Sequence, residues 1–295
     1  MSFSEQLKER VQEIETILNQ YLPEETGYQK TVIEAMNYTL KAGGKRVRPM
    51  LMYETYKKFG GNEKVIEPFM SAIEMIHTYS LVHDDLPALD NDMYRRGRKT
   101  AHVVFGEDMA ILAGDALLNY AFEVASMAFS MKEGDPKVGR AFQVLARKPG
   151  IYGMIGGQTA DVELTNKPLT LDQILFIHEN KTAALLECSM MIGAILAGAT
   201  PEEIYEIEQV GKDIGLAFQI EDDILDLIGT EEELGKPIKS DERNGKMTYV
   251  SIKGLEQSKE DAQLLTDRAI HRLTMLRGEN PFLTELLTYL VNRRK

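Results

Sequence analysis

The chain of 295 residues contains a single cysteine, Cys188, so it cannot form an internal disulfide bond. Cys188 lies in the apolar stretch from Leu185 to Leu196, and we therefore expect a small buried side chain rather than a reactive thiol. A chain without disulfides suits a reducing compartment. The cysteine content therefore favours a cytoplasmic location.

Long hydrophobic runs are also absent. No stretch approaches the ~18 uninterrupted apolar residues that a membrane-spanning helix requires. The first segment, Met1 to Asn19, is charged and amphipathic, and it lacks the apolar centre of a secretory signal. The sequence therefore predicts neither a membrane span nor export.

Basic residues are fewer than acidic ones. The chain has 34 lysines and arginines and 46 aspartates and glutamates, which give a formal net charge of -12. This balance argues against a nucleic-acid partner, which requires a broad basic surface. An anionic ligand would need cations placed locally. The chain also lacks low-complexity segments and flexible linkers, so we assign one domain over residues 1–295.

What the chain does contain is helical periodicity, with apolar residues recurring at spacings of three and four and few strand-like alternations. The helical pattern covers Leu7–Tyr21, Val32–Leu40, Val65–Val82, Met109–Phe129, Ile174–Leu196 and Ile204–Ile228. Glycine pairs at 43–44 and 60–61, Pro149–Gly150 and Pro201 separate these segments. Short connections favour neighbouring antiparallel helices. The predicted fold class is all-α, a bundle of long, mostly antiparallel helices.

A first acidic cluster begins with Asp84 and Asp85 at the end of an apolar helical pattern and continues to Asp90 and Asp92. The C-terminus of a helix carries partial negative charge, so acids there are disfavoured unless a cation compensates. Pro87 should end the helix and allow Asp90 to fold back toward Asp84. The cluster is therefore a candidate cation site.

A second acidic cluster places Gln219, Asp222 and Asp226 three and four residues apart, on one stripe of a helix. Magnesium prefers oxygen ligands and keeps positions open for water and phosphate oxygens. Either cluster alone could be a solvated helix end, but the two together favour a metal-bound polyphosphate. Calcium is a weaker alternative, because neither cluster has the glycine and alternating ligands of an EF-hand loop.

Cations lie next to these acids in the sequence. Lys45, Arg46 and Arg48 follow a glycine pair and open a helix, whose N-terminus also attracts anions. Arg95 and Arg96 follow the first acidic cluster. Each group alone could be a solvated face, but beside the acids they indicate a diphosphate site.

Two single residues extend this pattern. His77 lies seven residues before Asp84, about two helical turns, and so shares its stripe. It could donate to a second phosphate group or be a core histidine. Lys181 interrupts an apolar helix, where a buried lysine needs an anionic partner unless it reaches solvent.

Several segments, in this order, resemble the trans-isoprenyl diphosphate synthase family. They are Gly44–Pro49, Asp84–Gly97, Leu112–Leu117, Gly157–Gln158 with Asp161, Lys181–Thr182, Phe218–Asp226, Gly235–Lys236 and Ser240–Asp241. Lys99, Glu221 and Lys239 depart from the usual pattern of the family, and Lys239 puts the geometry of its loop in question.

The resemblance implies a helical bundle around a deep cavity, usually a homodimer, that acts on isopentenyl diphosphate and an allylic diphosphate. Asp84, Asp90 and Asp222 would ligate about three magnesium ions on the allylic diphosphate, with Asp85 and Asp226 in support. The residues that would hold this diphosphate are Arg95, Lys181, Thr182, Gln219 and Lys236. Those that would hold isopentenyl diphosphate are Lys45, Arg48, His77 and Arg96. The catalytic residues would be Asp84, Asp90, Lys181 and Asp222.

The implied reaction is ionisation of the allylic diphosphate, condensation with isopentenyl diphosphate and loss of a proton. Tyr79 and Ser80 lie about one turn before Asp84, where a bulky side chain would stop the growing chain. Tyr79 favours a C15 product over C20. Other hypotheses are a terpene cyclase, which the cations at 45, 48 and 77 disfavour, and an inactive regulatory subunit, which the intact acidic clusters disfavour.

Overall fold

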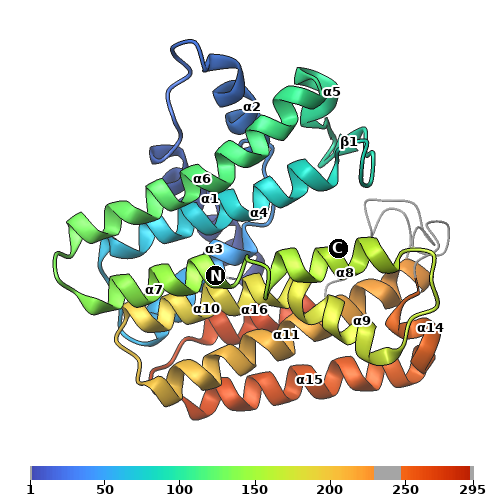
Figure 1. Cartoon of the computed structure of the whole chain (residues 1–295). Coiled ribbons are helices and arrows are strands. Elements are labelled where there is room, and N and C mark those ends of the chain that lie inside the picture. Colours follow the sequence, from blue (N-terminus) through green and yellow to red (C-terminus); the bar gives the residue numbers. More distant parts are fainter. Residues whose placement is uncertain (1, 229–246, 293–295) are drawn as a thin grey trace. The chain divides into compact units, whose positions relative to one another are not determined.

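The computed structural model describes residues 2–228 and 247–292, and these are almost entirely helical (Figure 1). The all-α prediction is therefore confirmed, with one short β-hairpin as an exception. The chain divides into two compact units, residues 1–53 with 62–143 and residues 54–61 with 144–295. Helices α3 (Val47–Lys58) and α7 (Pro136–Arg147) run from one unit into the other. The assignment of a single domain stays a prediction.

The first unit is built around α4, which packs along α6. Its elements are α1 (Phe3–Gln20), α2 (Lys30–Leu40), η1 (Lys64–Ile66), α4 (Glu67–Asp84), β1 (Tyr94–Arg95), β2 (Arg98–Lys99), α5 (Ala101–Phe105) and α6 (Glu107–Met131). A capping box between Ser2 and Glu5 starts α1. Apolar side chains of α4 are buried along most of its length, as expected for a helix that is hydrophobic on all sides.

The two strands form an antiparallel hairpin in which Tyr94 pairs with Lys99 and Arg95 pairs with Arg98. Arg96 and Gly97 form the turn, and both have positive φ, 53° and 75°. Positive φ at both central residues is typical of type I′ turns, which prefer asparagine and glycine. An arginine in this turn and strands of two residues explain why the sequence pattern did not predict the hairpin.

The second unit is built around α11, which packs against α10 and α15. Its elements are α8 (Met154–Leu164), α9 (Leu171–Ile177), η2 (His178–Ala183), α10 (Ala184–Leu196), α11 (Pro201–Ile228), α14 (Tyr249–Lys253), α15 (Leu255–Met275) and α16 (Pro281–Val291). Gly211 and Gly215 allow α11 to approach its neighbours, because a Cβ at Gly215 would lie 2.2 Å from the Cβ of Ala183.

One predicted helix differs from the observed structure in a way that concerns function. The pattern from Ile174 to Leu196 predicts one continuous helix, whereas the structure has a π-helical turn, η2, between α9 and α10. Pi turns are rare and often occur at functional sites. Lys181 and Thr182 both lie in η2.

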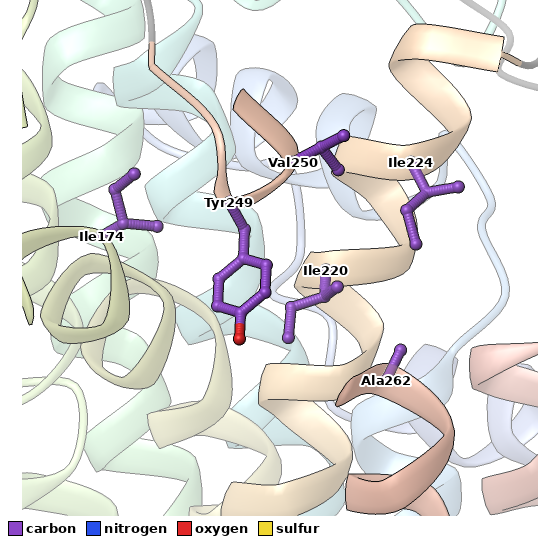
Figure 2. Packing of buried hydrophobic residues seen from close by; sticks show 6 residues of the cluster. All are labelled: Ile174, Ile220, Ile224, Tyr249, Val250 and Ala262. Carbon is purple, nitrogen blue, oxygen red and sulfur yellow. The ribbon is translucent and has the colours of Figure 1, made fainter. Parts of the chain in front are cut away.

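A small apolar core supports the end of α11 that carries the second acidic cluster. Figure 2 shows Ile220 and Ile224 of α11 with Tyr249 and Val250 of α14, Ile174 of α9 and Ala262 of α15. All six side chains are buried, and burial of this apolar surface stabilises the helix end. Within the residues that the structure describes, we find no helix with the length and apolarity required to cross a membrane.

Candidate active site

The first acidic cluster lies where α4 ends. Asp84 is the last helical residue, and the backbone N–H of Asp90 donates to its carbonyl at 2.9 Å. The N–H of Asn91 donates to the carbonyl of Leu86 at 3.1 Å. The chain therefore folds back after Pro87, as predicted, and brings the backbone of Asp90 to that of Asp84.

Asp85 and Arg95 form an ion pair within this cluster. Asp85 is buried, and it accepts a hydrogen bond from Nε of Arg95 at 2.7 Å. Arg95 also contacts Asp92 at 3.3 Å. Burial raises the pKa of the Asp85 carboxyl, and the bond from Arg95 only partly offsets this effect. Asp85 therefore holds the hairpin residue Arg95 at the end of α4.

His83 fixes the end of α4 against α6, a contact that sequence patterns did not indicate. Its Nε2 lies 3.1 Å from the carbonyl of Ile111, and its ring meets that of Tyr79 edge to face with centroids 5.8 Å apart. A Cβ at Gly114 would lie 2.0 Å from Nε2 of His83. Gly114 thus leaves the space that His83 occupies, and this explains the glycine in the Leu112–Leu117 segment.

Arg48, His77 and Arg96 come together in the first unit. Burial, together with the charges of Arg48 and Arg96, holds the pKa of His77 well below 6.5. Burial and Arg96 also lower the pKa of Arg48 to about 10, although Glu74 opposes the shift. The charge of Arg96 thus lowers the pKa values of both Arg48 and His77, and cations gathered in this way favour a bound anion. The three residues therefore fit the predicted diphosphate site.

Between the predicted site residues Lys45 and Arg48, Arg46 has a structural role. It is buried, donates to Glu74 at 2.7 Å and to the carbonyl of Leu40 at 2.7 Å. Lys45 is exposed. The ion pair of Arg46 therefore anchors the loop, while Lys45 is placed on its surface.

In the second unit, the predicted residues of η2 have partners. Nζ of Lys181 lies 2.6 Å from Asp161 of α8, and the hydroxyl of Thr182 donates to Gln219 of α11 at 2.6 Å. One pocket is lined by Asp161, His178, Lys181, Thr182, Gln219 and Asp223, among others. The structure therefore gathers Lys181, Thr182 and Gln219, as the sequence predicted, and supplies the acidic partner that Lys181 requires.

The acids of the second cluster differ in their surroundings. Asp223 is buried and accepts a hydrogen bond from the backbone N–H of Tyr249 at 2.7 Å, so it ties α14 to α11. Asp226 is also buried, whereas Asp222 is partly exposed. Burial lowers the pKa of His178, 3.8 Å from Asp223, to about 4, although Asp161 opposes the shift. Lys236 lies outside the described residues.

Tyr79 and Ser80 lie on α4, before Asp84. Tyr79 is buried, and its hydroxyl has no hydrogen-bond partner within residues 2–228 and 247–292. Burial, with the nearby charge of Asp84, raises the pKa of Tyr79 to about 12. Ser80 donates to the carbonyl of His77 at 2.9 Å. Tyr79 is therefore a buried ring, whereas the small side chain of Ser80 is bonded within its own helix.

Gly157 of α8 permits the close approach of η2. A Cβ at this position would lie 2.2 Å from the backbone nitrogen of Lys181 and 2.8 Å from its Cα, and backbone atoms cannot rotate away. We expect Gly157→Ala to lower the free energy of unfolding by about 1–3 kcal/mol. It should also displace Lys181 from Asp161. Urea unfolding measures the first effect.

Gly139 of α7 is a matched control. It is also a helical glycine, but a Cβ there would meet nothing within 4 Å. Gly139→Ala should therefore stabilise the chain by about 0.5–1 kcal/mol. Equal changes in the free energy of unfolding for Gly157→Ala and Gly139→Ala would contradict this prediction, because they would show that the approach of α8 to η2 leaves room for a side chain at residue 157.

The donor chemistry of both clusters fits magnesium. The available groups are carboxylate oxygens, which are hard ligands, and magnesium binds through one or two of them plus substrate phosphates and water. Among residues 2–228 and 247–292, no group of three or more histidine, cysteine or acidic side chains is arranged to hold a metal ion by itself. A magnesium ion held by these acids would take its other ligands from phosphate oxygens and water.

Comparison with known proteins identifies the class. The chain belongs to the polyprenyl synthetase family, whose sequence model matches residues 29–274. It is thus a trans-prenyltransferase, as the resemblance of the motifs implied.

Several known proteins are similar to this chain over most of its length. The farnesyl diphosphate synthase of Geobacillus stearothermophilus is 45% identical over 88% of this chain and 87% of its own. The geranylgeranyl diphosphate synthase of Cyanophora paradoxa is 43% identical over 97% and 95%. A Helicobacter pylori geranyltransferase, solved with magnesium and isoprenyl diphosphate, is 33% identical over 99% and 97%, with a TM-score of 0.83.

Proposed function

We propose that this chain condenses isopentenyl diphosphate with dimethylallyl or geranyl diphosphate and releases farnesyl diphosphate. The observation that carries the proposal is the order of groups along α4. His77 lies in the cationic group, Tyr79 is a buried ring, and Asp84 ends the helix in the acidic cluster. One helix thus offers groups for a phosphate, a hydrocarbon chain and a cation.

The magnesium ligands are proposed to be Asp84, Asp90 and Asp222, with Asp226 in support. When bound, magnesium supplies Lewis-acid stabilisation of the negative charge on the departing diphosphate. The fold-back that joins the backbones of Asp84 and Asp90 at 2.9 Å supports a pair of ligands there. Asp85, which we predicted to assist, is engaged with Arg95 and would act through it.

The diphosphate ligands are proposed as two sets. Lys45, Arg48, His77 and Arg96 would hold isopentenyl diphosphate. The effect of the Arg96 charge on the pKa values of Arg48 and His77 supports this set. The set for the allylic diphosphate is Arg95, Lys181, Thr182, Gln219 and Lys236. The hydrogen bonds of Lys181 to Asp161 and of Thr182 to Gln219 hold these side chains in place.

The side chains contribute to each step through charge and exclusion of water. Arg95 and Lys181 stabilise negative charge as the carbon–oxygen bond of the allylic diphosphate breaks. The apolar wall around the hydrocarbon chain would keep water from the allylic cation. The double bond of isopentenyl diphosphate then attacks, and the proton lost from the product passes to the departing diphosphate.

A C20 product, geranylgeranyl diphosphate, is the second candidate. A relative of that name is 43% identical over 97% of this chain, which favours it. The buried ring of Tyr79, about one turn from Asp84, favours the shorter product because it takes up space that a longer chain would need. An inactive regulatory subunit is disfavoured by the complete set of aspartates.

The assembly is proposed to be a homodimer, located in the cytoplasm. Helix α6 leaves the apolar side chains of Leu112 and Met127 exposed, about 60° apart around the helix axis. Exposed apolar side chains on one helix face suit contact with a second copy. Light scattering after gel filtration should give twice the mass of 33.3 kDa.

Product analysis tests the proposed function. Purified protein is incubated with isopentenyl diphosphate, dimethylallyl or geranyl diphosphate and magnesium, and the dephosphorylated products are sized by gas chromatography. A C15 alcohol supports farnesyl diphosphate synthesis, and a C20 alcohol supports the second candidate. No condensation by folded protein would overturn both.

A further inference from the structure

We propose that Tyr38 and Arg98 are positioning residues that hold the β1–β2 hairpin on α2 and thereby place Arg96 for isopentenyl diphosphate. The inference rests on the proposed function, because it assigns Arg96 to that substrate. It concerns only the first unit. Neither residue belongs to the predicted site, and neither is expected to touch a substrate.

Tyr38 of α2 contacts the hairpin and the helix that follows it. Its hydroxyl donates to the carbonyl of Lys99 in β2 at 2.8 Å. The guanidinium of Arg98 lies over its ring, 4.2 Å from the centroid, which is cation–π geometry. The ring of Phe105 in α5 meets it edge to face at 5.4 Å. One side chain thus links α2, β2 and α5.

Arg98 adds a link to the end of α2. Its Nη1 lies 3.5 Å from the carbonyl of Lys41, the C-cap residue of that helix. A helix C-terminus carries partial negative charge and attracts a cation. Lys41 and Ala42 precede the glycine pair that leads to Lys45. The hairpin is therefore fixed to the segment that carries the cationic loop.

Arg96 contacts the same loop. Its Nη1 donates to the carbonyl of Gly43. A Cβ at Gly44 would lie 2.8 Å from Cζ of Arg96, so Gly44 is where the guanidinium packs against the backbone. Arg96 depends on the position of the hairpin relative to α2 for this contact, and Tyr38 and Arg98 set that position.

External contacts are needed because the hairpin is weak by itself. Each strand has two residues, and isolated two-stranded hairpins are at best marginally stable in water. The turn also holds Arg96 at φ 53°, a left-handed conformation that is unfavourable for an arginine. Arg95 has a separate anchor in Asp85. Loosening the hairpin should therefore affect Arg96 more than Arg95.

Steady-state kinetics on the full chain test the inference. Tyr38→Ala removes the hydrogen bond and both ring contacts, and we expect KM for isopentenyl diphosphate to rise about 10-fold, with kcat and KM for the allylic substrate within about 2-fold. Tyr38→Phe keeps the ring, and Arg98→Met keeps much of the length without the charge. Each should raise the same KM by about 3-fold.

Tyr28→Phe is the matched control, because Tyr28 is a fully exposed tyrosine of the same unit, and no change is expected. A merely structural role of Tyr38 would lower the melting temperature, reduce kcat and change KM for both substrates alike. That pattern, or an unchanged KM for isopentenyl diphosphate in folded Tyr38→Ala, would overturn the inference.

Calorimetric titration with inorganic pyrophosphate separates this inference from the proposed function. If wild-type protein forms no prenyl product, the proposed function fails. Weaker pyrophosphate binding by Tyr38→Ala, with Tyr28→Phe unchanged, would then still support the positioning of Arg96 as an anion ligand. Equal binding by all three proteins would overturn it.

Discussion

Replacing Asp84 by alanine is expected to lower kcat at least about 10²- to 10³-fold, because it removes a carboxylate proposed to bind magnesium as the diphosphate departs. Asp222→Ala should have a similar effect from the second unit. Asp84→Asn, which keeps the shape but not the charge, should lose nearly as much. Prenyl transfer at saturating magnesium measures all three.

The structure gives reason to expect that the Asp84 variants will fold. The hydrogen bond that folds the chain back uses the backbone carbonyl of residue 84, which alanine retains. Asp108→Asn is a suitable control, since Asp108 is an exposed acid in the first turn of α6. It should keep full activity. Turnover near that of the wild type in Asp84→Ala would remove this residue from the metal site.

Replacing Tyr79 by alanine is expected to move the main product from C15 to C20 or longer. The substitution removes a buried ring about one helical turn before Asp84, so a growing chain meets less obstruction there. It should also destabilise the chain by about 3 kcal/mol, because it leaves a cavity. Gas chromatography of the dephosphorylated products measures the change in length.

Tyr79→Phe is the matched control for this change. It keeps the ring and removes a hydroxyl that is buried without a hydrogen-bond partner among the described residues, so it should be neutral or slightly stabilising. Its product should remain C15. An unchanged C15 product in Tyr79→Ala, with the variant shown to be folded, would place the limit of the chain at another residue.

The long helices were predictable because their burial is periodic. The segment Met109–Phe129 lies inside α6, Glu107–Met131, and Ile204–Ile228 lies inside α11, Pro201–Ile228. Pro201 starts α11, as expected of a proline in the first turn of a helix. The fold-back of Asp90 also followed from Pro87. The helices and the fold-back depend on residues that are close together in the sequence, so the sequence pattern alone is enough to predict them.

Contacts between distant residues were not predictable in this way. Tyr38 lies 61 residues from the carbonyl that it binds, and His83 meets Gly114 on another helix. Nothing in the local pattern of α2 or α4 indicates either partner. The motifs named the acids and cations that carry charge, but not the side chains that hold them in position.

Some predicted residues proved to be paired with one another or with a neighbouring acid. Asp85 and Arg95 were expected to serve metal and diphosphate separately, yet they form an ion pair. Lys181 was predicted to need an anion, and Asp161 supplies one. Sequence spacing shows which charges are near along one helix, but the pairing depends on how the loops and helices pack.

The π turn at η2 fixes the register of the segment that contains Lys181. A π turn holds one residue more than an α turn, and each residue of a helix advances by about 100°. If the same residues formed one unbroken α-helix instead, the side chains of α9 would be rotated against those of α10 by about that angle. The side chains on one half could then no longer match those on the other, although every residue type in the motif would still be present.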